Sequence, residues 1–432
     1  MPLHKLFLLL LFLSLSGCAT NPVTGEKQFN LMSEDKEMAM GDSYYPVYTQ
    51  VSNGLFQDKN LQSYINQTGK KCAAKSHRPQ LNYEFNVVNT SVINAYALPG
   101  GKISITRGLL NLMENEDQLA GVLSHEIGHV AARHVASGYT RSVLTGFGLS
   151  LLDTVMAAKE VKNREYYNTA AGLATNLIVM KYSRDQEREA DALGMEYMVK
   201  AGYNPVGFVQ AMQILQSLSQ REPSKLEIMF QSHPMPLERI ENAKAQIQSN
   251  FATLQSNTFQ VDEFLKNTNY LKKVSLAYKQ CDQAEELTKK EKFGDAIIKL
   301  KNALTIAPDE ALIHTTLSAT YFAEKKYDEA TNEIKQSLSI YPDLFMSRFL
   351  AGLILHTTNN FKTSITHLKI ADKLVPDNVN VVFYLGLNYE KLKKIETAAG
   401  YYKRLLQLTT KGEKAEYAYK RLCEWGYISH SR

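Results

Sequence analysis

The hydrophobic positions of the chain fall into three stretches with different patterns. Residues 6–15 form an apolar run interrupted by a single serine. Between residue 19 and about residue 245 the apolar positions follow no fixed period, and from Leu109 onward most of this stretch has a helical pattern. From about residue 277 the apolar positions repeat at a constant interval. This division predicts a leader, a mixed helical and stranded domain, and a helical repeat domain.

The C-terminal stretch repeats every 34 residues, as the spacing of Pro308, Pro342 and Pro376 illustrates. Other positions keep the same interval: Phe293, Tyr327, Phe361 and Ile395; the small residues Ala296, Ala330, Ser364 and Ala398; and Gly352 with Gly386. The pattern resembles the tetratricopeptide repeat, in which small residues let two helices pack closely and a proline ends the second helix. We predict units at 277–310, 311–344, 345–378 and 379–412, with a capping helix near 413–427. They should form an α-solenoid whose concave face binds other polypeptides.

The apolar run near the N-terminus is typical of a signal peptide. Lys5 supplies a short positive region before it, and the run is too short to span a bilayer core of about 30 Å. It is followed by Leu15-Ser16-Gly17-Cys18, which resembles a bacterial lipobox. We therefore predict that a signal peptide of residues 1–17 is removed and that Cys18 is lipidated; a plain secretory signal with a chance cysteine is the alternative. Ala19, in place of an aspartate, points to sorting to the outer membrane.

Composition narrows the class of protein without identifying it. The chain of 432 residues is 44% hydrophobic and 22% charged, which excludes wholesale disorder, collagen and fibrous coiled coil. Its 49 basic and 44 acidic residues leave a net charge of +5, so nothing marks it as a nucleic-acid binder. Four cysteines are too few for a disulfide scaffold. Cys281 and Cys423 can pair only if the fold brings their Cα atoms within about 7 Å, which the sequence leaves open.

The strongest chemical motif is the sequence His-Glu-Ile-Gly-His at residues 125–129. Asn115 predicts the start of a helix that contains this motif, and Gly138 predicts its end. On that helix the two histidines lie one turn apart on one face, where both imidazoles reach a single Zn²⁺. The glutamate lies about 100° around the helix, beside the metal. There it can take a proton from a zinc-activated water and pass it to the leaving amine.

A catalytic zinc needs a third protein ligand, and the same helix does not supply it. A metzincin would have glycine at 132 and histidine at 135, where this chain has alanine and valine. His134 lies about 180° around a straight helix from His125, so we expect it to point away from the metal and to be structural. A second predicted helix contains Glu187 and Asp191 on one face, which suits a ligand and a carboxylate that orients a ligand imidazole. Glu189 lies about 200° around and cannot share that face.

The segment between two predicted strands, 83–88 and 102–106, completes the pattern. Residues 94–101 read Asn-Ala-Tyr-Ala-Leu-Pro-Gly-Gly, and the last three predict a turn. With the HEIGH motif and the later EREAD segment, they resemble the HtpX-like gluzincin metallopeptidases. The signal and the repeat half make the combination similar to periplasmic members of that family. The resemblance implies a mainly α fold: an α+β gluzincin metallopeptidase domain with a small sheet, followed by the α-solenoid of tetratricopeptide repeats.

The resemblance implies a role for each residue of the two helical motifs. His125, His129 and Glu187 would bind one Zn²⁺ per chain. Glu126 would be the catalytic base, and Asp191 would support the site. All five residues match the family motif at their positions in this sequence.

The resemblance also implies two features that border the cleft. A loop histidine, His233, would lie near the zinc, either as a latch on the open coordination position or as a hydrogen-bond donor to the tetrahedral intermediate. A plain His-Pro turn is the alternative. An edge strand would hold substrate backbone by strand addition, through Asn94, Ala95 and Tyr96.

The function implied by the resemblance is zinc-dependent proteolysis in the bacterial periplasm. The substrates would be unfolded or misassembled outer-membrane polypeptides, and the repeats would contact the outer-membrane assembly machinery. Lipidated Cys18 would anchor the chain to the inner leaflet of the outer membrane; no nucleic-acid partner is expected. One alternative is a chaperone or scaffold whose protease site is mostly latched, and another is a general peptidase. The predicted divisions are a signal peptide at 1–17, a metallopeptidase domain at 18–245, a linker at 246–276 and a repeat domain at 277–427.

Overall fold

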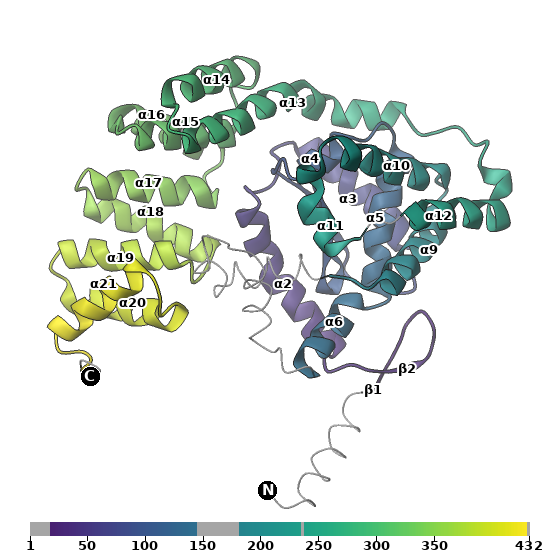
Figure 1. Cartoon of the computed structure of the whole chain (residues 1–432), viewed down its shortest axis with the longest axis horizontal. Helices are drawn as coiled ribbons and strands as arrows, with labels where there is room; N and C mark the ends of the chain where they lie inside the picture. The colour runs from purple at the N-terminus through teal and green to yellow at the C-terminus, as the bar shows by residue number, and fades with distance from the viewer. Residues whose placement is uncertain (1–17, 145–180, 235–236, 430–432) are drawn as a thin grey trace, which may run out of the picture. The chain divides into compact units, whose positions relative to one another are not determined.

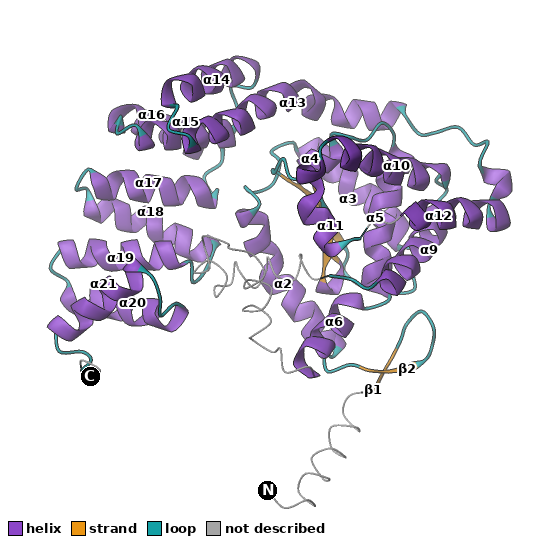
Figure 2. Cartoon of the chain, in the orientation of Figure 1, coloured by secondary structure: helices purple, strands orange, loops and turns teal. Residues whose placement is uncertain are grey.

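The computed structural model describes residues 18–144, 181–234 and 237–429. The predicted signal peptide lies outside these residues. The described chain is mainly helical, with a small proportion of strand (Figure 2). None of its helices combines the length and the apolar character that a membrane span requires. The mainly α fold with a small sheet, predicted from the sequence, is confirmed.

The chain separates into two compact units, which are described one at a time. The first contains the described residues up to Tyr45 and those between Asp58 and Tyr270. The second contains Pro46–Gln57 and the described residues from Leu271 onward. Helices α2 (Glu34–Val51) and α13 (Asp262–Lys289) therefore contribute residues to both units.

The described part of the first unit combines helices with two small sheets, one of two strands and one of three. Its strands are β1 (Cys18–Thr20), β2 (Lys27–Phe29), β3 (Glu84–Val88), β4 (Ala95–Leu98) and β5 (Lys102–Thr106). Its other helices are α3 (Lys59–Ala73), α4 (Arg107–Leu110), α5 (Glu116–Ala131), α6 (His134–Leu144), α9 (Arg184–Lys200), α10 (Val206–Arg221), α11 (Glu227–Ser232) and α12 (Leu237–Asn250). Short 3₁₀ turns occur at Pro99–Gly101, Pro223–Leu226 and Ala252–Leu254.

The three-stranded sheet places β4 at an edge. The strand order is β3-β5-β4, with β3 parallel and β4 antiparallel to β5. The turn between β4 and β5 needs a left-handed backbone at Gly100 (φ 75°) and Gly101 (φ 85°), a region that glycine enters without a steric penalty. The predicted strands and turn are therefore present. Because every residue of β4 and β5 is buried, the sheet forms part of the core beside α5.

Helices α5 and α9 pack so closely that glycine is required at their contact. A Cβ atom on Gly128 would lie 2.8 Å from the carbonyl oxygen of Ala190, and one on Gly194 would lie 2.8 Å from the backbone nitrogen of His125. Each helix starts at a side-chain cap: Asn115 accepts a hydrogen bond from the backbone of α5, and Ser183 forms a capping box at the start of α9. This contact brings the two motif-bearing helices face to face.

The second unit consists of helix pairs that follow the predicted period. The pairs are α15 (Ala311–Ala323) with α16 (Tyr327–Ile340), α17 (Phe345–Thr357) with α18 (Phe361–Leu374), and α19 (Val379–Lys391) with α20 (Ile395–Leu408). They follow one another in order along the unit (Figure 1). Helix α14 (Phe293–Ile306) precedes them, and α21 (Glu413–Glu424) follows them in the region of the predicted cap. The helical repeat fold is confirmed.

The small residues of the repeat are buried between the paired helices, as expected. Ala296, Ala330, Ser364 and Ala398 are all fully inaccessible to solvent. Ser364 also donates a hydrogen bond from its hydroxyl to the carbonyl oxygen of Gly352, on the partner helix, at 2.7 Å. These positions therefore set the distance between the two helices of a pair.

The region between the two predicted domains is partly helical. The segment predicted as a linker, 246–276, includes the first half of α13, a helix of 28 residues that continues into the first predicted repeat. Pro46–Gln57 belongs to the second unit, far in sequence from the repeats. Cys281 and Cys423 do not form a disulfide, and Cys281 is buried beside Thr316.

Candidate metal centre

Four buried side chains from three elements meet at one point in the first unit. They are His125 and His129 of α5, Glu187 of α9, and His233, which directly follows α11. Each offers one ligand atom, and these atoms all lie within 4.8 Å of one another. The three ligands predicted from the sequence are thus brought together, and His233 joins them.

The distances between the facing atoms are short. Nε2 of His129 lies 3.0 Å from Nε2 of His125 and 3.4 Å from Oε1 of Glu187. Nδ1 of His233 lies 3.0 Å from Oε1 of Glu187 and 3.4 Å from Nε2 of His125. Two imidazoles and a carboxylate are a donor set typical of zinc.

The contact of His125 with a carboxylate supports a cation between these atoms. Its Nδ1 lies 2.9 Å from Oδ1 of Asp191, and a carboxylate can only accept, so Nδ1 carries the proton. Nε2 of His125 then carries no proton, and its lone pair faces Nε2 of His129. Lone pairs and a carboxylate that converge in a buried site repel one another unless a cation lies among them. The residues present therefore fit a zinc ion.

Burial and neighbouring charges set the protonation of the cluster. Burial lowers the pKa of His129 well below its usual value, which keeps the imidazole neutral and able to coordinate. Burial alone would raise the pKa of Glu187, but His233 and His129 beside it hold that pKa far below its usual value. Glu187 is therefore an ionised carboxylate, as a metal ligand must be.

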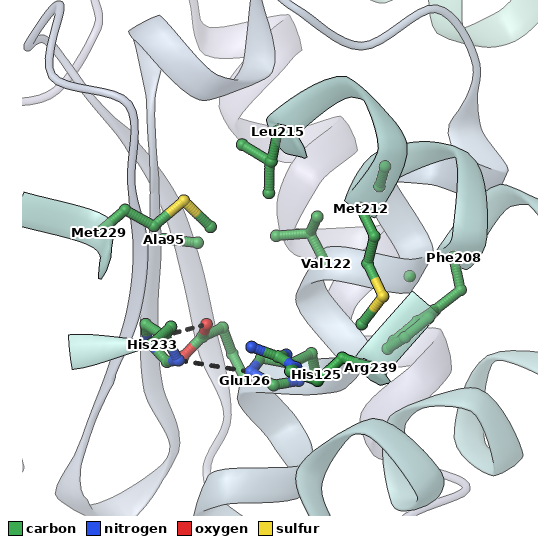
Figure 3. Close-up of a pocket in the computed structure, with 12 residues that line it drawn as sticks. Ala95, Val122, His125, Glu126, Phe208, Met212, Leu215, Met229, His233 and Arg239 are labelled. Atoms are coloured by element: carbon green, nitrogen blue, oxygen red, sulfur yellow. Dashed lines mark hydrogen bonds and ion pairs between the residues drawn. The ribbon is translucent and has the colours of Figure 1, made fainter. Parts of the chain in front are cut away.

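Glu126 lies next to the cluster on α5 and has a free oxygen. Its Oε1 is 3.8 Å from Nε2 of His233, while its buried Oε2 has no hydrogen-bond partner among the described residues (Figure 3). Burial raises the pKa of Glu126 above its usual value. A carboxylate of raised basicity with a free oxygen beside a metal site suits the predicted role of proton acceptor.

Arg239 of α12 connects the ligand helix to the loop of His233. Its guanidinium contacts Glu187 at 2.5 Å and Asp191 at 2.6 and 2.7 Å, and it donates to the carbonyl oxygen of Pro234 at 2.9 Å. Asp191 therefore lies against His125 and is itself held by Arg239. The contacts of Arg239 with Glu187 and Asp191 have no local sequence signal, because they join residues about 50 positions apart.

An apolar cleft opens beside Glu126. It encloses about 470 Å³, part of it open to solvent. Its apolar lining comes mainly from α5 and α10, with the side chains Val122, Phe208, Ala211, Met212, Leu215 and Met229 (Figure 3). Of the three predicted substrate-binding residues, Ala95 lines this cleft, whereas Asn94 and Tyr96 are buried and are not part of its lining.

The predicted end of the helix that carries the HEIGH motif is wrong. Helix α5 ends at Ala131, not at Gly138, because Arg133 has a left-handed backbone (φ 56°). The chain turns there, and His134 begins α6 with its Nδ1 2.8 Å from Nδ1 of His129. His134 also contacts Glu189, Nε2 to Oε2, at 3.1 Å. The prediction assumed a straight helix; the break brings His134 against His129, although His134 is not among the four residues whose ligand atoms converge.

Tyr182, which the sequence did not single out, stacks on the ring of His129. The ring centroids are 3.9 Å apart and the planes are inclined by 22°. The backbone nitrogen of Tyr182 donates to the carbonyl oxygen of Ser232, one residue before His233. The sequence shows only that a tyrosine stands five residues before Glu187. Nothing in the neighbouring residues indicates that this tyrosine stacks on His129.

Comparison with known proteins finds relatives for the part of the chain that contains the metal cluster. Residues 59–247 match the model of Peptidase family M48. A beta-barrel assembly-enhancing protease of Yersinia pestis is 33% identical over 229 residues, which make up 52% of this chain and 46% of that protein. The metalloprotease YcaL of Escherichia coli K12 is 32% identical over 165 residues, 38% of this chain and 62% of that protein.

The chain thus spans about half the length of the assembly-enhancing proteases that it matches. Among solved structures, PilF of Pseudomonas aeruginosa matches with a TM-score of 0.34 and 20% identity, over 35% of this chain and 70% of that one. The resemblance to metallopeptidases that the HEIGH and EREAD segments predict is confirmed by the match to the beta-barrel assembly-enhancing proteases (BepA). Residues 59–247, which contain the whole metal cluster, are thus the part of the chain that is similar to peptidase family M48.

Proposed function

We propose that the protein is a zinc-dependent endopeptidase. The observation that carries the proposal is the buried cluster of His125, His129 and Glu187 with the free oxygen of Glu126 beside it. The curated relatives of the matching domain are named as proteases, which supports the same activity. We assign His125, His129 and Glu187 as the ligands of one Zn²⁺ per chain and Glu126 as the general base.

The residues of the site divide the chemical work among them. A zinc ion held there would supply Lewis acidity toward a peptide carbonyl and a water molecule. Glu126 takes a proton at its free Oε2 and returns it to the leaving nitrogen, and its raised pKa makes it a stronger base. Asp191 fixes His125 in the tautomer whose Nε2 is free. Arg239 neutralises the two carboxylates that would otherwise repel each other.

The surroundings of Glu126 favour a particular substrate: an extended, unpaired segment with a large apolar side chain. β4 is an edge strand that can pair with an extended backbone, and its Ala95 lines the cleft. Met212 and Met229 in the lining are flexible side chains that can adapt to different apolar groups. Unfolded or misassembled outer-membrane strands have this character, and the names of the relatives refer to β-barrel assembly.

We further propose a place for the protein in the cell. Lipidated Cys18 would hold the chain at the inner leaflet of the outer membrane, on the periplasmic side, and the repeats would contact the assembly machinery. The proposed divisions remain a metallopeptidase domain at 18–245, a linker at 246–276 and a repeat domain at 277–427. In this arrangement the solenoid holds a polypeptide and the cleft cuts its unpaired strands.

The test uses the chain from Ala19 onward with an unfolded outer-membrane β-barrel protein, and with the same protein folded as a control substrate. We expect cleavage of the unfolded form alone, and we expect Glu126→Gln to reduce the rate by at least about 100-fold. Glu196→Gln, on the outer part of α9, is the matched control and should cut at the parent rate. Equal cleavage by Glu126→Gln and the parent would contradict the assignment of the base.

The position of His233 favours a second candidate function, a chaperone or scaffold with a latched protease site. Its Nδ1 lies within 3.4 Å of both a ligand carboxylate and a ligand imidazole, so it can close the coordination shell against substrate. If His233 is such a latch, His233→Ala should cut faster than the parent and retain its zinc. If His233→Ala cuts more slowly, His233 contributes to catalysis. If neither protein cuts but both keep the substrate soluble, the scaffold function is favoured.

A further inference from the structure

The far side of His129 carries a second set of hydrogen bonds. Nε2 of His129 faces the metal cluster, whereas its Nδ1 faces Nδ1 of His134 at 2.8 Å. Nε2 of His134 then faces Oε2 of Glu189 at 3.1 Å. His129 and His134 are fully buried or nearly so, and Glu189 is half-buried with 34% of its side chain exposed. The three side chains form a continuous chain from the candidate ligand to the edge of solvent.

The chemistry of the three groups permits one arrangement of protons that leaves His129 free to coordinate. A carboxylate only accepts, so Nε2 of His134 must carry a proton that it donates to Glu189. In a neutral His134, Nδ1 is then an acceptor. The short contact between the two Nδ1 atoms therefore requires His129 to donate from its own Nδ1. With its single proton there, His129 presents a lone pair at Nε2.

We propose that His134 and Glu189 are positioning residues that hold His129 in the Nδ1-protonated tautomer and fix the direction of its ring. The inference rests on the proposed zinc site, and it adds two residues that the sequence motif does not include. His125 receives its orientation from the carboxylate of Asp191 directly. His129 receives the same orientation from a carboxylate acting through an intermediate imidazole.

The break in α5 is what makes this contact possible. On a continuous helix His134 would lie on the opposite side from the cluster, but the left-handed backbone at Arg133 turns the chain back toward His129. The break is stabilised by buried contacts of Arg133, whose Nε donates to Oε2 of Glu37 at 2.9 Å and whose Nη2 donates to the carbonyl oxygen of Met32 at 2.8 Å. An unfavourable backbone is thus retained where it places an imidazole beside a ligand.

The ring of His129 is also restrained from its face. Tyr182 stacks on it, so the ring cannot rotate freely about its Cβ–Cγ bond. Stacking fixes the plane of the ring but does not distinguish one tautomer from the other. The choice between Nδ1–H and Nε2–H therefore depends on the acceptors at the two nitrogens: Glu187, 3.4 Å from Nε2, and His134 with Glu189 behind it, 2.8 Å from Nδ1.

The first experiment needs no substitution. Nitrogen-15 NMR of the zinc-free protein with labelled histidines reports which nitrogen of each neutral ring is protonated. We expect His129 to carry its proton on Nδ1 and His134 to carry its proton on Nε2. A His129 protonated on Nε2 would overturn the proposal, because the contact between the two Nδ1 atoms would then run in the opposite direction.

The second experiment measures zinc affinity by competition with a chelator. Loss of a residue that orients a ligand histidine typically costs 10- to 100-fold in metal affinity. We expect a loss of about that size for His134→Ala and a smaller loss for Glu189→Ala. His134→Asn, whose Oδ1 can accept from His129, should recover part of the affinity. His77→Ala, which removes an imidazole bonded to Tyr197 outside the site, is the matched control and should bind like the parent.

Combining the substitutions tests whether the two residues act in series. If Glu189 acts only through His134, then Glu189→Ala should have no further effect in the His134→Ala or His134→Asn background. Additive losses would contradict the chain of contacts, as would unchanged affinity in folded His134→Ala. If the parent protein binds no zinc, the proposed function itself fails. If the parent binds zinc, and His134→Ala binds it equally tightly, only the positioning role of His134 is contradicted.

Discussion

Two arginines, one in each unit, show how differently the two regions are built. Arg239 of the first unit is 5% exposed and binds two buried carboxylates of the metal centre. Arg404 of the second unit also binds two carboxylates, Asp372 and Asp377, but its side chain is 31% exposed. The first unit has buried charges that must be neutralised by specific partners. The second relies on buried apolar and small residues, and its ion pairs lie near solvent.

The comparison predicts that removal of the arginine has a much larger effect in the first unit. Arg239→Met would leave Glu187 and Asp191 buried together without a cation, at a cost of about 3–5 kcal/mol to the zinc-free protein. Arg404→Met would cost less than about 1 kcal/mol, because water can solvate its partners. Hydrogen exchange of the α9 and α20 amides reports the two units separately. Equal losses of stability for Arg239→Met in the first unit and Arg404→Met in the second would contradict the contrast between the two units.

Glycines at helix contacts offer a smaller contrast of the same kind. A Cβ on Gly194 would meet backbone atoms of α5, the closest at 2.8 Å, so Gly194→Ala must push α9 away from α5. We expect a loss of about 1–3 kcal/mol and weaker zinc binding. A Cβ on Gly352 would meet Cγ and Cδ2 of the buried Leu368, both at 2.6 Å, so that this side chain, rather than a backbone, has to shift. Because alanine favours the helix by about 1 kcal/mol and offsets part of this strain, Gly352→Ala should cost less than Gly194→Ala.

These two results are measured by the zinc affinity of Gly194→Ala and by the unfolding of the second unit in Gly352→Ala. The chain has a single tryptophan, Trp425, which lies in the second unit, so its fluorescence reports that unit alone. If Gly352→Ala unfolds the repeats as easily as Gly194→Ala disrupts the metal centre, then the repeats are packed as rigidly as the site.

The repeats could be predicted in detail because each position has the same packing task in every unit. Helices α15, α17 and α19 begin at Ala311, Phe345 and Val379, which are 34 residues apart and coincide with the predicted unit boundaries. In a periodic sequence, each repeat independently indicates the same local structure. An error at one position is therefore corrected by the others.

The metal centre could be predicted only as far as its motifs reach. The HEIGH spacing placed His125 and His129 on one face, and the i, i+4 spacing placed Glu187 with Asp191. The end of α5 was predicted wrongly because it depends on Glu37, a residue 96 positions away that binds Arg133. Contacts of this kind have no local signal, so the contact of His134 with His129 could not be predicted either.

Left-handed residues provide a third test, with opposite signs in the two units. Such residues recur every 34 positions between repeat helices, at Glu291, Lys325, Asn359 and Lys393. Lys325→Gly should relieve the strained backbone and stabilise the second unit by about 0.5–1 kcal/mol. Arg133→Gly relieves the same strain but removes the buried contact with Glu37, so it should destabilise the first unit.

The measurement for Lys325→Gly is the midpoint of urea unfolding followed by Trp425 fluorescence. Asn359→Gly is its control and should gain less, because asparagine tolerates the left-handed region better than lysine does. For Arg133→Gly the measurement is hydrogen exchange in α5 and α6. Stabilisation in both units would show that the contacts of Arg133 contribute little to stability.

The smallest expected effect concerns pH, and it too should differ in direction between the units. In the second unit, burial alone would lower the pKa of His314, but its hydrogen bonds to Glu333 at 2.7 Å and to the carbonyl oxygen of Pro308 at 2.9 Å raise it. A histidine with a raised pKa stabilises the fold below its unfolded pKa of about 6.5, and this contribution is lost as the pH rises through the folded value.

In the first unit the sign is reversed. Burial alone would raise the pKa of Asp191, but Arg239 and His125 hold it below its usual value of 3.8, so its contribution is lost only as the pH falls below that region. His314→Gln should therefore lower the unfolding temperature of the second unit by less than about 2 °C at pH 6, and by less still at pH 8.5. Trp425 fluorescence measures that difference. An equal decrease in unfolding temperature at both pH values would mean that His314 stabilises the second unit as a neutral hydrogen-bonded ring. The predicted opposite pH dependence of the two units would then be contradicted for the second unit.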